Sequence, residues 1–108
     1  MFNINGIEWE IIWVNGNSSY LMRSDGSITV GMTDWHDKCV YLANGLRGAF
    51  LRKVLAHELC HCFCFSHDIY MPIDEEERLA DWISLYGTEL VYLLDDILNT
   101  ALKKAYAM

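Results

Sequence analysis

The first half of the chain alternates short apolar runs with turn residues, a pattern typical of β-strands. Residues 7–14 are rich in isoleucine, valine and tryptophan, and this run ends at the turn signal Asn15-Gly16. Two further runs, at residues 27–32 and 38–43, are joined by a short polar connection. Three or four short strands with close connections predict a small, mostly antiparallel sheet.

The second half of the chain has helical periodicity instead. Residues 46–65 contain no proline, and Asn44 stands where the N-cap of a helix is expected. Pro72 interrupts this pattern, and Asp74 opens a second helix in which apolar positions recur every three or four residues. Gly87 is expected to bend or divide that helix. Strands first and helices last predict an α+β fold.

The composition narrows the possible classes of protein. The 108 residues suffice for one domain, predicted to span residues 1–108. Fifteen acidic against eight basic residues give a net charge of −7, and because such a surface repels phosphate backbones we expect no nucleic-acid partner. No apolar run reaches the roughly 18 residues of a membrane span, so no membrane partner is expected. The N-terminal residues lack a signal-peptide pattern, which favours a cytoplasmic protein.

The cysteines are expected to be reduced thiols in such a compartment. Three of the four alternate along the first predicted helix, at Cys60, Cys62 and Cys64. Because Cys62 points about 160° away from Cys60 around the helix axis, the three cannot converge on one ion. They are predicted to be small buried groups that pack against the sheet.

The candidate catalytic motif is His57-Glu58-Leu59-Cys60-His61, an HExxH sequence. Side chains four residues apart leave the same side of a helix, so both imidazoles can reach a single Zn²⁺. Glu58 lies beside them and can take a proton from a water molecule. The residue types and their spacing therefore predict a zinc site with Glu58 as the catalytic base.

A catalytic zinc site needs a third protein ligand and one open position. Glu77, near the start of the second predicted helix, is the favoured third ligand. Asp81, one turn further on, is expected to accept the outer N–H of one motif histidine and so to fix its tautomer. The same acids also suit a capping box, Asp74-x-x-Glu77. The fallback ligands are Glu75 and Glu76.

His67 is the competing third ligand. It lies ten residues after His57, which is the spacing of the HExxHxxGxxH motif. That motif has a glycine where this chain has Cys64, and the glycine lets the chain turn back toward the metal. We therefore expect His67 to be an exposed residue after the helix, while a site that uses His67 stays open as an alternative.

An HExxH helix followed by a helix with Glu77-x-x-Ala80-Asp81 resembles the minimal gluzincins of the ImmA/IrrE type. The resemblance spans roughly residues 27–86, and Leu85-Tyr86-Gly87-Thr88 departs from that family's Leu-Leu-Met-Pro ending. It implies a zincin-like fold and a zinc-dependent endopeptidase. The implied ligands are His57, His61 and Glu77, with Glu58 as the base.

The resemblance also implies a class of partner. Members of this family are common in bacteria and their phages, and several cleave repressor proteins, so the expected partner is a protein or peptide substrate. An exposed edge strand, residues 27–32 or 38–43, is expected to pair with an extended substrate. The alternative is a catalytically silent, zinc-stabilised binding module such as an adaptor or antirepressor. Residues 90–98 are strongly apolar and are a candidate surface for self-association or partner docking.

Overall fold

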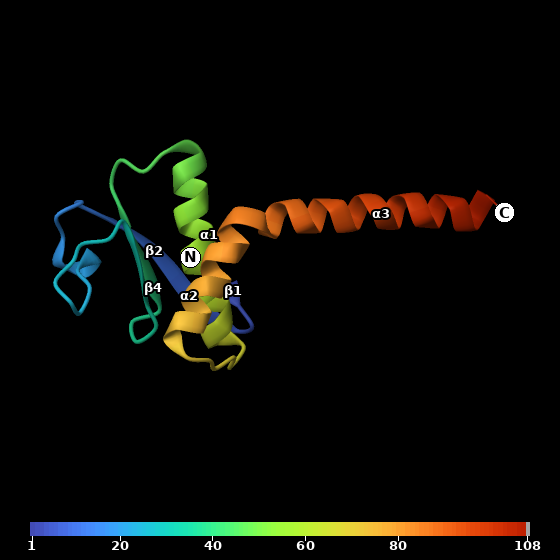
Figure 1. The fold of residues 1–108 in the computed structure, drawn as a ribbon. Coiled ribbons are helices and arrows are strands. Elements are labelled where there is room, and N and C mark those ends of the chain that lie inside the picture. The colour runs from blue at the N-terminus through green and yellow to red at the C-terminus, as the bar shows by residue number, and fades with distance from the viewer. Residues whose placement is uncertain (108) are drawn as a thin grey trace.

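The computed structural model describes residues 1–107, with side chains described to residue 101. A four-stranded sheet packs against one long helix, a second helix lies beside the first, and a third leaves the body (Figure 1). The elements are β1 (Phe2–Ile4), β2 (Ile7–Val14), η1 (Ser19–Leu21), β3 (Gly31–Asp34), β4 (Cys39–Ala43), α1 (Gly48–Ser66), α2 (Ile73–Trp82), η2 (Ile83–Gly87) and α3 (Thr88–Ala107). The predicted α+β class is confirmed.

The sheet is mixed, with the strand order β1-β2-β4-β3. Strands β1 and β2 pair antiparallel, as do β3 and β4, whereas β2 and β4 pair parallel. The prediction of a mostly antiparallel sheet thus holds for two of the three pairings. Strand β4 lies inside the sheet and every one of its residues is buried. The expectation that residues 38–43 form an exposed edge is therefore wrong, and the free edge beside β4 is β3.

Two strand predictions need correction. The chain begins with a hairpin that the sequence analysis did not predict, although Asn5-Gly6 is the same turn signal as Asn15-Gly16; its first strand, β1, has only three residues. Asn5 and Gly6 form its two-residue turn with φ angles of 52° and 85°, as a primed hairpin turn requires. The strand predicted at residues 27–32 begins only at Gly31. Residues 27–30 instead fold back on η1, where the Thr29 amide donates to the Leu21 carbonyl at 2.9 Å.

Helix α1 begins at Gly48, whereas an N-cap at Asn44 would have started it three residues earlier. The Asn44 amide donates to the Val14 carbonyl at 2.7 Å, so this residue still belongs to the sheet. Gly45 then turns the chain with a φ of 96°, and Arg47 is the N-cap. The helix ends at Ser66, close to the predicted end.

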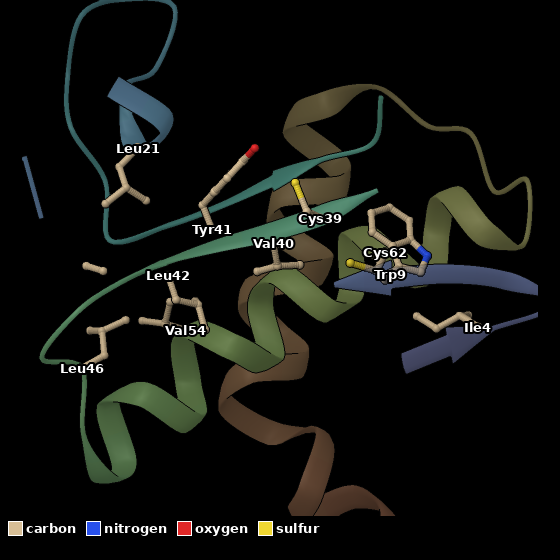
Figure 2. Close-up of a cluster of buried hydrophobic side chains, with 11 residues drawn as sticks. Ile4, Trp9, Leu21, Cys39, Val40, Tyr41, Leu42, Leu46, Val54 and Cys62 are labelled. Carbon is tan, nitrogen blue, oxygen red and sulfur yellow. The ribbon is translucent and has the colours of Figure 1, made fainter. Parts of the chain in front are cut away.

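The main core fills the space between the sheet and α1 (Figure 2). Trp9 of β2 is fully buried, and its indole Nε1 donates to Ser66 Oγ at 2.8 Å. Val54 and Cys62 reach the same cluster from α1, together with Leu42 from β4. Because this packing anchors α1 along its length, it fixes which side of the helix faces away from the core.

The opposite side of α1 receives α2, which begins at Ile73 directly after Pro72. Pro72 is the N-cap and makes no side-chain cap, so the predicted capping box does not form. Next follows η2, a π-helical turn that ends at Gly87, where a break was expected. Helix α3 then extends away from the body (Figure 1). No helix among residues 1–107 is long and apolar enough to cross a membrane.

Candidate metal centre

One turn of α1 presents two imidazole rings on the side turned toward α2. His57 and His61 are half-buried, and their Nε2 atoms lie 3.3 Å apart. Their spacing of four residues places both rings on one side of the helix, as the sequence predicts. The two nitrogens thus point into one shared space.

Glu77 of α2 brings its carboxylate to both rings. Its Oε2 lies 3.0 Å from Nε2 of His57, and its Oε1 lies 3.0 Å from Nε2 of His61. Ligand atoms of the three residues all lie within 4.8 Å of one another. His57, His61 and Glu77 therefore lie close enough together to bind a metal ion.

The outer ring nitrogens are held by two further acids of α2. Asp81 Oδ1 lies 2.9 Å from Nδ1 of His57, and Glu76 Oε2 lies 2.7 Å from Nδ1 of His61. The expected contact of Asp81 with a motif histidine is thus present. Glu76, considered only as a fallback ligand, occupies the equivalent position at the other histidine, which sequence reasoning missed.

The inner nitrogens of His57 and His61 and the carboxylate of Glu77, which we call the donor set, suit a metal cation. With the proton on Nδ1 and donated to the outer carboxylate, each ring would carry a lone pair on Nε2 that is available to a cation. Two acceptor nitrogens and a carboxylate at 3.0–3.3 Å repel one another unless positive charge lies between them. Each Glu77 oxygen lies 3.0 Å from one ring nitrogen and the two nitrogens lie 3.3 Å apart, so these three residues can hold a metal cation between them.

Glu58 lies directly beside this donor set and is 8% exposed. The Thr33 hydroxyl of β3 lies 2.8 Å from Glu58 Oε1 and donates to it. The second carboxylate oxygen, Oε2, lies 4.0 Å from Nε2 of His57. One oxygen is therefore held by the sheet while the other faces the site. Sequence reasoning missed Thr33, because the contact joins residues 25 positions apart.

Strand β3 approaches α1 very closely at Gly31. A Cβ atom there would lie 2.8 Å from Cγ1 of Val54 and 3.2 Å from Cγ of Glu58. Only glycine therefore lets β3 lie against the helix without displacing the Glu58 side chain. This close approach brings Thr33, two residues along, within reach of the carboxylate.

The donor set lines a cavity of about 630 Å³. Its other walls come from β3 and the segments on either side of it, and from the segment between α1 and α2. They are mostly apolar but include Arg23 and Ser24. Trp35 is on the wall and is 60% exposed. Met22, Ile69 and Tyr70 also line the cavity with exposed side chains. The cavity combines one polar patch with a wide apolar rim.

The structure does not bring His67 to the site. It is the C-cap of α1, is exposed, and stacks on Phe63 with ring centroids 5.8 Å apart. It lies outside the group of potential ligands found among the described residues. Glu75 is likewise exposed on α2 and makes no contact with either motif histidine. The geometry thus favours Glu77 over both alternatives.

The four cysteines are buried free thiols. Cys62 packs in the core against the sheet, as predicted, whereas Cys60 and Cys64 pack against Ala80 of α2 and not against the sheet. Burial raises the pKa of Cys60 and of Cys62 to about 12. The thiols are therefore protonated at neutral pH and act as packing groups.

Comparison with protein-family models, with curated proteins and with solved structures found no match to this chain. The functional assignment consequently rests on the residues of the site and their geometry.

Proposed function

We propose that this chain is a zinc-dependent endopeptidase with a zincin-like fold. The observation that carries the proposal is the convergence of His57, His61 and Glu77 at 3.0–3.3 Å beside a carboxylate, Glu58, that is oriented but not a ligand. A purely structural zinc site has four protein ligands, whereas a catalytic site has three and an open position. The set here has three.

When bound, zinc would supply Lewis-acid polarisation of a peptide carbonyl and would acidify a water molecule. His57 and His61 would hold the ion through Nε2, while Asp81 and Glu76 keep the protons on the outer nitrogens. Glu58 accepts the proton of the attacking water at Oε2 and passes it to the leaving amine nitrogen. The Thr33 hydroxyl keeps Oε1 occupied, so that Oε2 is the atom that exchanges the proton.

The substrate is an extended segment of a protein or peptide. Strand β3 is one of the two edge strands of the sheet, and its residues Gly31, Met32 and Thr33 line the cavity. An extended chain paired with this edge would cross directly in front of Glu58. The resemblance to ImmA/IrrE-type gluzincins favours a regulatory protein such as a repressor.

The test is cleavage of a peptide library, prepared from a digested proteome and analysed by mass spectrometry, by the zinc-loaded protein. Glu58→Gln should abolish cleavage while the zinc content is unchanged, because the amide cannot accept the proton. Glu75→Gln is the matched control on an exposed acid and should cleave normally. Cleavage that survives Glu58→Gln would contradict the mechanism. Zinc binding without cleavage in the wild-type protein would instead favour the silent binding module.

A further inference from the structure

Helix α3 has one apolar face that nothing else in the described chain covers. Successive residues of a helix are rotated by 100°, so Leu90, Leu94, Ile97 and Ala101 form one stripe, which we call the α3 seam. Their spacing of four, three and four residues is that of a coiled-coil interface. Val91, Leu93 and Leu98 flank the seam on its two sides.

The seam is solvent-exposed over the part of α3 whose side chains the structure describes, residues 88–101. Six large apolar side chains, those of Leu90, Val91, Leu93, Leu94, Ile97 and Leu98, are 48–58% exposed. Only the start of α3 is tied to the body, where Arg52 Nη2 of α1 donates to Thr88 Oγ1 at 3.0 Å. Beyond it the helix leaves the sheet and α1 behind (Figure 1). An apolar face of this extent is typical of an interaction surface.

We propose that the α3 seam pairs two copies of this chain in an antiparallel dimer. The seam is self-complementary under a two-fold axis, since antiparallel pairing sets Leu90 beside Ala101 of the second copy and Leu94 beside Ile97. If each of the six large apolar side chains loses roughly 80 Å² of surface in both copies, the pair buries about 1,000 Å², which is about the threshold for a biological interface.

Charge favours both a protein partner and the antiparallel orientation. Within the span of the seam, residues 90–101, the charged residues are Asp95 and Asp96, whereas helices that lie on membrane surfaces carry basic polar faces. Each chain also has a net charge of −7. Antiparallel helices place the two acidic bodies at opposite ends of a molecule whose single copy already extends 61 Å, which minimises their repulsion.

The proposal does not depend on the proposed peptidase activity, because the seam lies on α3 and the metal site on α1 and α2. The experiment is sedimentation velocity of the full chain from low micromolar to several hundred micromolar concentration. The wild-type protein should dimerise. Leu94→Glu should raise the dissociation constant of the dimer by about 100-fold or more, since it buries two charges per dimer. Asn99→Glu, the same charge on the opposite face of α3, should change it by less than about threefold.

Orientation is tested by cross-linking. Leu90→Cys and Ala101→Cys variants, mixed and oxidised, should form mainly mixed disulfide dimers, because the native thiols are buried. A wild-type monomer at every concentration would overturn the proposal, as would a dimer equally stable in Leu94→Glu. Disulfides formed mainly between identical variants would overturn the antiparallel arrangement. The zinc content is measured on the same samples. A variant that no longer dimerises but still binds zinc has therefore lost only the dimer interface.

Discussion

At the scale of single residues, the account depends on how Glu58 is oriented. The Thr33 hydroxyl donates to Oε1 at 2.8 Å and thereby turns Oε2 toward the histidines. Thr33→Val removes this donor at nearly constant volume, so kcat/KM is expected to fall by about 10–100-fold while the zinc affinity is unchanged. Thr33→Ser keeps a hydroxyl and should retain most of the activity. Equal losses in the two variants would contradict the orienting role of this hydroxyl.

The two acids behind the histidines are not equivalent. The Glu76 side chain is 19% exposed and that of Asp81 is 67% exposed, so solvent screens the Asp81 contact more strongly. Glu76→Gln is therefore expected to weaken zinc binding by about 10–100-fold, and Asp81→Asn by less. Competition with a chelating dye measures both dissociation constants. If Asp81→Asn weakened zinc binding more than Glu76→Gln, the solvent exposure of the two acids would not explain their relative importance.

Much of the candidate site could be predicted from local sequence. The shared direction of His57 and His61 follows from helix geometry alone, and the pair Glu77 and Asp81 follows from the same rule on α2. Thr33 could not be predicted, since its contact with Glu58 depends on how β3 packs on α1. The contact of Glu76 with His61 was not predicted, because the rotation of α2 against α1 decides which acid meets Nδ1 and which meets Nε2.

At the scale of elements, the distance between β3 and α1 is the critical quantity. A Cβ at Gly31 would lie 2.8 Å from Val54 and 3.2 Å from Glu58. Gly31→Ala should lower the free energy of unfolding by about 1–3 kcal/mol, because the strand or the helix must move. The rate of peptide cleavage should fall by more than the loss of folded protein accounts for, because a Cβ at Gly31 also displaces the Glu58 side chain.

Chemical denaturation and peptide cleavage measure the two effects. Gly16→Ala is the matched control, because a Cβ at Gly16 meets nothing within 4 Å. If both alanine variants behaved alike, the close approach of β3 would not matter for the site.

Element boundaries were predicted less well than element types. The apolar run 27–32 suggested a strand, but two backbone hydrogen bonds close a loop there first: the Arg23 amide donates to the Ser27 carbonyl, and the Thr29 amide donates to the Leu21 carbonyl of η1. Helix α1 begins late because Asn44 still pairs with Val14 of the sheet. The two errors have different causes, since the first reflects a local loop and the second reflects pairing of two residues far apart in the sequence, Asn44 and Val14. The π-helical turn at Gly87 was anticipated only as a break.

At the scale of the whole molecule, buried thiols link stability to pH. Burial raises the pKa of Cys39 on β4 above its usual value of 9.0. Above that pH the unfolded chain has lost the thiol proton while the native protein still keeps it, so the unfolded state binds fewer protons and stability falls as pH rises. Cys39→Ala should be less stable at neutral pH but should lose less stability on going from about pH 8 to about pH 10. Urea denaturation at both pH values measures this, and parallel losses in the two proteins would contradict it.

The overall arrangement was predictable only in part. Strands followed by helices indicated the α+β class, but not the parallel pairing of β2 and β4, which needs a crossover of chain that periodicity does not encode. The apolar residues 90–98 were identified as a candidate docking surface. Their position on a helix that projects from the body is a property of the turn at η2, and sequence periodicity alone does not specify it.

The central claim is that His57, His61 and Glu77 form one zinc site. The most direct measurement is the zinc content and zinc dissociation constant of the purified protein and of two variants. The account predicts one tightly bound ion per chain, loss of binding in Glu77→Ala, and normal binding in His67→Ala. A protein that binds no zinc, or one that keeps it in Glu77→Ala and loses it in His67→Ala, would contradict the account.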